Sequence, residues 1–146
     1  MTNQFPIPGE PDTPAGGPTK PNNALVVTGS DVNTTNEEYA TNPQLVIDNN
    51  EVFAYTDALI EVSYQSSSNR TTRSLIVGLF IDNVLVESEN IMEHKDTSNA
   101  IPRYRLYTYT FTPGQTYNIQ LRYGKSGGGD AVTVTVEYPK IKIREK

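Results

Sequence analysis

Hydrophobic and polar residues alternate over much of the chain after residue 43, and this period-two pattern is typical of β-strands with one buried face. Within ALIEVSYQ, Ile60, Val62 and Tyr64 alternate with polar residues. TYNIQLRY repeats the pattern over residues 116–123, and AVTVTVEY repeats it with alternate valines. Each of these segments is therefore predicted to form a strand with one face in a hydrophobic core.

Two further segments carry apolar residues that bear on assembly. The alternation in RYRLYTYTF places Arg105, Tyr107, Tyr109 and Phe111 on one face of a strand and Tyr104, Leu106, Thr108 and Thr110 on the other. SLIVGLFID is apolar on both faces, which is typical of a central strand covered on both sides or of a strand whose outer face meets a partner. Together with the nine tyrosines of the chain, this pattern suggests an oligomer interface. The candidate interface residues are Ile76, Phe80, Tyr107 and Tyr109.

Turn signals separate the predicted strands. Asp82-Asn83 suits a two-residue hairpin loop, and Pro113-Gly114 suits a type II turn. The polar stretch 29–43 is predicted to be a loop, and Pro139 is predicted to end a strand. The chain then holds about eight to ten short strands and no convincing helix. This predicts an all-β antiparallel β-sandwich, and the strand count favours a jelly roll over an immunoglobulin-like fold.

The first 24 residues differ from the rest in composition. The segment contains Pro6, Pro8, Pro11, Pro14, Pro18 and Pro21. Its large apolar residues are only Met1, Phe5 and Ile7, which is too little to offset the entropy of ordering the segment alone. We therefore expect residues 1–24 to form a Pro/Gly-rich extended arm or tether and residues 25–146 to form the β-sandwich domain.

Composition excludes several classes of function. The chain has 146 residues, no cysteine and a formal net charge of −5, so it has no thiol chemistry and lacks the basic surface that a nucleic-acid partner would require. No apolar run approaches the roughly 18 residues of a membrane span. The N-terminus lacks a basic region followed by an apolar one, so we expect no secretory signal and no membrane partner.

Candidate chemistry is sparse. His94 is the single histidine and lies in a polar stretch, which favours a solvated loop residue over a catalytic or metal-binding one. GKSGGGD has the glycines of a phosphate-binding loop but not its spacing. No carboxylate spacing matches a calcium loop or a glycosidase pair. The sequence therefore predicts no enzymatic activity, no catalytic or metal-binding residues and no cofactor.

The arrangement of the strands resembles jelly-roll domains of bacteriophage structural proteins, which are similar to the tumour-necrosis-factor and complement-globular-head folds. The resemblance is carried by RLYTYTFTPGQTYNIQLRYGKSGGGDAVTVTVEYPKIKIRE, with its aromatic strand, Pro-Gly turn and Gly-rich loop. Upstream, YTDALIEVSYQSSSNRTTRSLIVGLFIDNVLV resembles the first half of such a domain. The resemblance covers about residues 44–146 and does not reach the arm.

The resemblance implies a virion protein, made in a host cytoplasm and assembled as a homotrimer. One expected role is a capsid decoration or cement protein whose partner is the major capsid protein or a neighbouring virion subunit. The alternative is the tip of a head fibre or tail fibre that binds a host-surface glycan or receptor. In the first role the arm attaches the protein to its virion partner, and the expected partner-binding residues are Phe5, Pro6, Ile7, Pro8, Pro11 and Pro14.

Overall fold

Nine β-strands and no helix make up the described part of the chain, which confirms the predicted all-β fold. The computed structural model describes residues 24–35, 37–92, 100–127 and 131–146. The strands are β1 (Leu25–Thr28), β2 (Val32–Thr34), β3 (Gln44–Val52), β4 (Asp57–Ser68), β5 (Ser74–Ile81), β6 (Val84–Met92), β7 (Ile101–Thr110), β8 (Thr116–Lys125) and β9 (Val134–Glu145). Within these ranges, nothing forms a helix long and apolar enough to cross a membrane.

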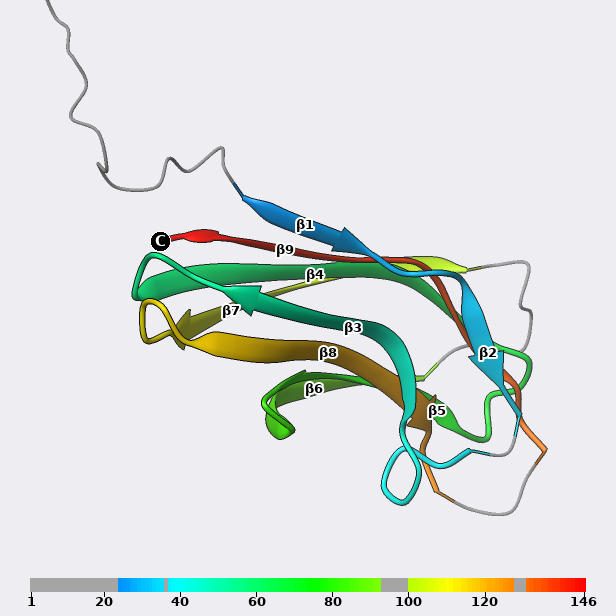
Figure 1. Cartoon of the computed structure of the whole chain (residues 1–146). Coiled ribbons are helices and arrows are strands. Elements are labelled where there is room, and N and C mark those ends of the chain that lie inside the picture. Colours follow the sequence, from blue (N-terminus) through cyan, green and yellow to red (C-terminus); the bar gives the residue numbers. More distant parts are fainter. Residues whose placement is uncertain (1–23, 36, 93–99, 128–130) are drawn as a thin grey trace, which may run out of the picture.

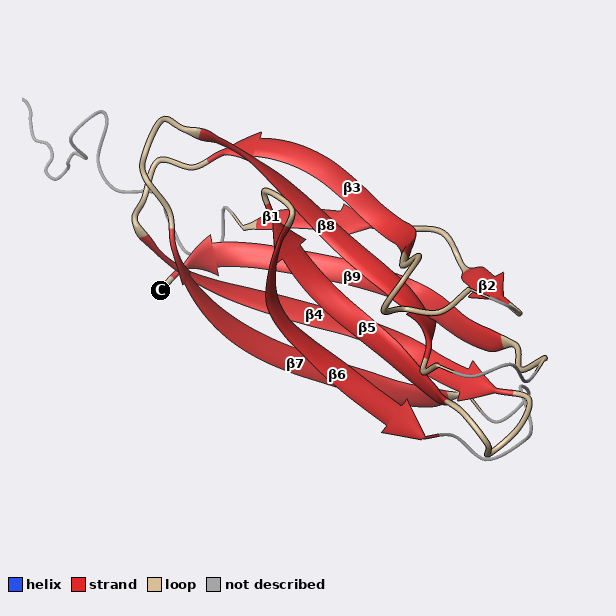
Figure 2. Ribbon diagram, turned by 90° about the horizontal axis from the view of Figure 1, so that it is seen from below, coloured by secondary structure: helices blue, strands red, loops and turns tan. Residues whose placement is uncertain are grey.

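The strands form two antiparallel sheets that pack face to face (Figures 1 and 2). One sheet has the order β1-β9-β4-β7, with β2 also paired to β9, and the other has the order β3-β8-β5-β6. Because β1 and β2 pair with successive parts of β9, they share one edge position. The eight positions then follow the interlocked order of a jelly roll, in which most connections cross from one sheet to the other. The predicted jelly-roll sandwich is confirmed.

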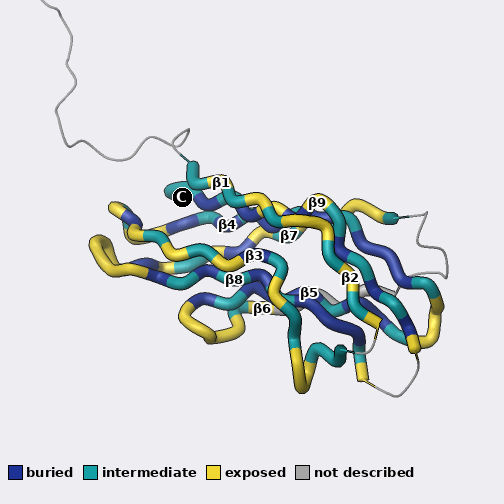
Figure 3. The backbone as a smooth tube through the Cα atoms, turned by 45° about the vertical axis from the view of Figure 1, so that its right-hand side comes forward, coloured by how far each residue is buried: buried dark blue, intermediate teal, exposed yellow. Residues whose placement is uncertain are grey.

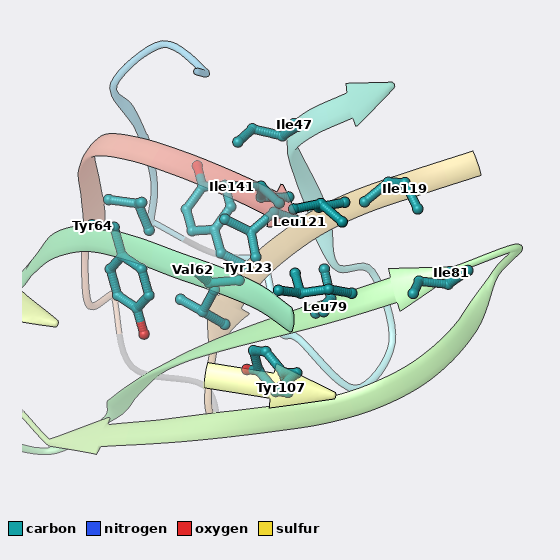
Figure 4. Packing of buried hydrophobic residues seen from close by; sticks show 14 of the residues in the cluster. Ile47, Val62, Tyr64, Leu79, Ile81, Tyr107, Ile119, Leu121, Tyr123 and Ile141 are labelled. Atoms are coloured by element: carbon teal, nitrogen blue, oxygen red, sulfur yellow. The ribbon is translucent and has the colours of Figure 1, made fainter. Parts of the chain in front are cut away.

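The core lies between the two sheets and is built from alternate residues of the long strands. Figure 4 shows side chains of both sheets, such as Val62 of β4 and Leu79 of β5, pointing toward one another. Figure 3 shows buried segments along the strands and exposed residues at the turns. The strand residues predicted to be buried are buried: Ile60, Val62, Tyr64, Tyr117, Ile119, Leu121, Tyr123, Val134, Val136, Ile141 and Ile143.

Strand β7 has the two faces that its sequence predicts. Tyr107 and, directly after the strand, Phe111 are 7% and 1% exposed, whereas Tyr104 and Leu106 are 58% and 50% exposed. The predicted hairpin between β5 and β6 is also confirmed, because Asp82 and Asn83 have φ angles of 50° and 66° and Val84 pairs with Ile81. Two consecutive left-handed residues are what a tight hairpin turn requires.

Two details of the sequence prediction were wrong. The stretch 29–43 contains strand β2, and Pro139 lies within β9 instead of ending a strand. Pro139 is accommodated because the register between β4 and β9 shifts beside Tyr138, which has a φ of 52°. At such a bulge the missing N–H of proline interrupts no regular ladder hydrogen bond. The carbonyl of Pro139 accepts a hydrogen bond from the amide of Gly29 at 3.0 Å.

Candidate functional site

The outer face of the four-stranded sheet carries a set of polar side chains that contact one another. We call Asp48, Asn50, Asn118, Gln120 and Arg122 the amide-rich face. Figure 2 views the molecule from the side of this sheet. Register positions these residues, since β3 and β8 pair Asp48 with Gln120 and Asn50 with Asn118. Within each strand they alternate with residues that point into the core, such as Ile119 and Leu121.

Hydrogen bonds join the side chains of β3 and β8. The Nδ2 of Asn118 donates to Asp48 Oδ1 at 2.8 Å and to Asn50 Oδ1 at 3.0 Å. The Nε2 of Gln120 donates to the same Asp48 oxygen at 3.1 Å. One carboxylate oxygen therefore receives two amide donors, and this fixes the orientation of both amides.

Arg122 extends the network toward β5 and the β5–β6 turn. Its Nε donates to Gln120 Oε1 at 2.8 Å, and its terminal nitrogen donates to Asn83 Oδ1. The guanidinium carbon lies 4.3 Å from the centre of the Phe80 ring. A cation above an aromatic face is electrostatically favourable, so Phe80 helps to hold the guanidinium over β5.

The electrostatics of the amide-rich face favour an ionised Asp48. Hydrogen bonds from Asn118 and then Gln120, helped by the charge of Arg122, lower the pKa of the Asp48 carboxyl. A glycosidase general acid needs a raised pKa, so Asp48 is unsuited to that role. Asp48 and Arg122 carry charges of opposite sign, and Gln120 is hydrogen-bonded to both. The arrangement offers hydrogen-bonding groups and charges of both signs to a polar ligand.

A short segment, residues 37–42, bounds one end of the amide-rich face. The amide of Tyr39 donates to the carbonyl of Lys125 at 2.9 Å, and the amide of Lys125 donates to the carbonyl of Glu37 at 3.0 Å. The ring of Tyr39 lies over β5 and β8, where Gly78 and Gly124 leave room for it. Its centre is 6.4 Å from that of Phe80. The two glycines are thus explained by the close approach of Tyr39.

Clefts occur at the edges of the sandwich. One of about 390 Å³ is lined by residues 24–25 and 51–55. Another of about 520 Å³ lies at the β9 bulge and is lined by residues 28–31 and 138–140. Among the described residues, no group of three or more histidine, aspartate or glutamate side chains is arranged to hold a metal ion.

The candidate site residues named from the sequence fall into three groups. Those of the arm, and also His94, lie outside the described residues. Ile76 and Phe80 lie half-buried on the outer side of β5. Tyr107 is buried in the core, and Tyr109 packs against the core with its ring 4.8 Å from that of Phe111. Tyr107 and Tyr109 therefore offer little surface to a second subunit.

Comparisons with known proteins find structural similarity at low identity. No family model matches the sequence, and no curated protein sequence matches it either. The CBM36-1 domain of a multidomain xylanase from the hindgut metagenome of Trinervitermes trinervoides has a TM-score of 0.46 at 11% identity, over 81% of this chain and 95% of that domain. Dimeric latent PorU from Porphyromonas gingivalis has a TM-score of 0.45 at 12% identity, over 84% of this chain and 13% of PorU.

A viral protein is similar to the same degree. The VP2 subviral particle of infectious bursal disease virus has a TM-score of 0.40 at 11% identity, over 93% of this chain and 42% of that chain. Similarity at these values carries no argument about function.

Proposed function

We propose that this chain is a non-enzymatic virion structural protein, a capsid decoration protein that attaches to the particle through residues 1–24. The observation that carries the proposal is the position of β1. The arm joins the sandwich at Leu25, and all four residues of β1 pair with β9, from Leu25 with Ile143 to Thr28 with Lys140. The start of β1 lies beside the C-terminal end of β9 (Figure 1).

This pairing suits a tether. A pull on the arm along the axis of β1 shears β1 against β9. The backbone hydrogen bonds between the two strands then carry the force together instead of opening one after another. Each such bond contributes about 0.5–1.5 kcal/mol. Leu25 and Val27 are also partly buried against the core, which resists peeling of the strand. Force on the arm is thus transmitted to β9, a central strand of its sheet.

The anchors of the arm are Phe5 and Ile7, which flank Pro6. In an extended backbone, residues two positions apart point to the same side, so both side chains reach one groove of the capsid. Burying two such side chains yields about 3–6 kcal/mol. A contact of this size is weak alone and effective when several copies bind together. The proposed homotrimer provides that multiplicity, with Ile76 as its remaining candidate contact, because Phe80 carries the Arg122 guanidinium and lies beside Tyr39.

Deletion of residues 1–23 tests the tether. We expect a nearly unchanged thermal midpoint and a loss of co-sedimentation with capsids assembled without this protein. Replacing Phe5 and Ile7 together by alanine should reproduce much of the loss, whereas the matched pair Thr2→Ala and Thr13→Ala should not. Full occupancy by the deletion variant at similar affinity would show that the arm is a bystander. Sedimentation of the intact chain tests the trimer, and a strict monomer at high micromolar concentration contradicts it.

A second candidate function is the tip of a head fibre or tail fibre that binds a host-surface glycan. One specific observation favours it, namely the network of amide, carboxylate and guanidinium groups on the outer face of the four-stranded sheet. Decoration and glycan binding are compatible in one chain, because the arm and the amide-rich face are formed by different residues. The two candidates are therefore tested independently.

A further inference from the structure

We propose that the amide-rich face binds a neutral glycan, with Asn118 and Gln120 as its central contacts. The proposal rests on the second candidate function and gives it a location and a ligand class. It places recognition on a sheet face formed by β3, β8 and β5, and not on the loops between strands. The argument follows from the hydrogen-bonding groups, the charge, the neighbouring apolar residues and the rigidity of this face.

The hydrogen-bonding groups match sugar hydroxyls. A hydroxyl both donates and accepts, and an amide side chain offers two donors and an acceptor within one planar group. Asn50, Asn118 and Gln120 supply such groups from two adjacent strands. Asn118 uses both amide hydrogens on Asp48 and Asn50 and offers its Oδ1, whereas Gln120 donates one hydrogen to Asp48 and offers the other. Neighbouring strands lie about 4.8 Å apart and alternate residues on one strand about 6.6–6.8 Å apart, so the groups form a grid and not a single point of contact. A grid suits a ligand that carries hydroxyls along its length.

The charge of the face selects against acidic sugars. Asp48 and Arg122 contribute one charge of each sign. Asp82, in the β5–β6 turn, adds a second carboxylate. Its Oδ1 accepts a hydrogen bond from the backbone amide of Asn118 at 2.8 Å. Arg122 is already engaged by Gln120, Asn83 and the Phe80 ring. A uronic or sialic acid carboxylate would therefore meet two aspartates and a guanidinium that is already occupied, whereas a neutral sugar meets no repulsion.

Apolar residues flank the polar groups on the same side of the sheet. Leu45 is opposite Arg122 in the register and is 51% exposed. Leu85 is opposite Phe80 and is 45% exposed. The C–H faces of a pyranose are apolar, so exposed leucines offer surface to such a face while the neighbouring amides contact the hydroxyls.

The face is organised before any ligand binds. The amides of Asn118 and Gln120 are oriented by Asp48, and the guanidinium of Arg122 is oriented by Gln120 and Phe80. Ordering a flexible side chain on binding costs about 0.5–1.5 kcal/mol, so side chains that are already ordered avoid much of this cost. The segment with Tyr39 closes one end of the face and limits where a chain of sugars lies.

The experiment uses the intact chain and an array of neutral gluco-, xylo-, manno- and galacto-oligosaccharides, with uronic-acid and sialylated glycans on the same array. Titration calorimetry then measures the affinity for the strongest neutral oligosaccharide. Asn118→Ala and Gln120→Ala should each weaken binding about tenfold or more, because each removes the hydrogen bond that its amide offers to the ligand and releases the groups that this amide orients. Gln65→Ala is the matched control, since Gln65 lies on the outer side of β4 in the other sheet, and it should change affinity less than about twofold.

Each result decides the proposal. Binding of neutral oligosaccharides that is lost in Asn118→Ala and Gln120→Ala, with thermal midpoints unchanged, supports it. An array without neutral hits, a preference for acidic glycans, or equal affinity in all three variants overturns it. The variant with alanine at both Phe5 and Ile7 separates the two functions, because it should bind the oligosaccharide normally and fail to attach to capsids.

Discussion

Replacing Gly78 by alanine tests how Tyr39 is seated on the sheet. A Cβ atom added at Gly78 would overlap the hydroxyl of Tyr39 and would lie 3.0 Å from both the Cζ of Tyr39 and the Cδ1 of Leu85. The Tyr39 ring must therefore shift and lose part of its contact with Phe80. Overpacking of this kind costs about 1–3 kcal/mol, and the lower entropy of the unfolded alanine chain returns about 0.4–1 kcal/mol. We expect a net loss of about 1–2 kcal/mol in the free energy of unfolding.

The Tyr39→Phe variant makes this expectation specific. The Tyr39 hydroxyl is buried and has no hydrogen-bond partner among the described residues, so its removal should stabilise the fold by about 1 kcal/mol. In the Tyr39→Phe background the overlap with the new Cβ disappears, and the nearest atoms are those at 3.0 Å. Gly78→Ala should then cost less than about 0.5 kcal/mol. The difference between the two backgrounds is a coupling energy of about 0.5–2 kcal/mol, within the usual range for residues in contact.

Urea denaturation of the unsubstituted chain, the two single variants and the double variant measures this coupling from midpoints and slopes. Gly127→Ala is the control, because nothing lies within 4 Å of the added Cβ and only the unfolded-state term remains. We expect it to be neutral or slightly stabilising. An equal cost of Gly78→Ala in both backgrounds, or a cost no greater than that of Gly127→Ala, would refute the proposed seating of Tyr39.

Two further predictions concern the core. Burial raises the pKa of Tyr123 to about 12 from an ordinary value of 10.0, so above pH 10 the unfolded chain releases a proton that the folded chain retains. Stability should fall between pH 10 and 12, by up to about 1.4 kcal/mol per pH unit for this residue, and urea unfolding at several pH values should show a shallower fall in Tyr123→Phe. Leu121 is fully buried and Leu106 is 50% exposed. Leu121→Ala should therefore lower the free energy of unfolding, measured in urea, by about 2–5 kcal/mol, and Leu106→Ala by less than about 0.5 kcal/mol. Similar losses in the two variants would contradict the assignment of buried and exposed faces.

The strands with one buried face were predictable from the sequence because alternation reports burial directly. In β8 each apolar residue between Tyr117 and Tyr123 is buried, and the intervening polar residues are partly exposed. For the two-sided apolar strand β5 the sequence left two alternatives open, a strand covered on both sides or a strand whose outer face meets a partner. Its inner side packs in the core, and Tyr39 packs beside Phe80 on its outer side. That cover comes from a segment predicted to be loop, so alternation alone could not identify it.

The irregular parts were less predictable because they depend on contacts between distant segments. Strand β2 has three residues and forms only because β9 offers an edge beyond its bulge. Proline usually ends a strand, but Pro139 follows Tyr138 in a left-handed conformation, and the bulge removes the need for its missing N–H. The amide of Tyr138 instead donates to Asp31 Oδ1 at 2.8 Å, across a sequence separation of 107 residues.

The amide-rich face depends even more on register. Asn118 and Gln120 are separated in sequence from Asp48 by 70 and 72 residues, and from the sequence they appear only as solvent-facing positions of an alternating strand. Their meeting is set by a bulge between Leu45 and Ile47, which adds one residue to β3 relative to β8. If Val46 were paired regularly and no bulge formed, Ile47 would lie opposite Gln120 and Asp48 opposite Ile119, so that a carboxylate would enter the core. The bulge therefore keeps Ile47 buried and Asp48 on the outer face, and the same feature that completes the core also assembles the proposed glycan site.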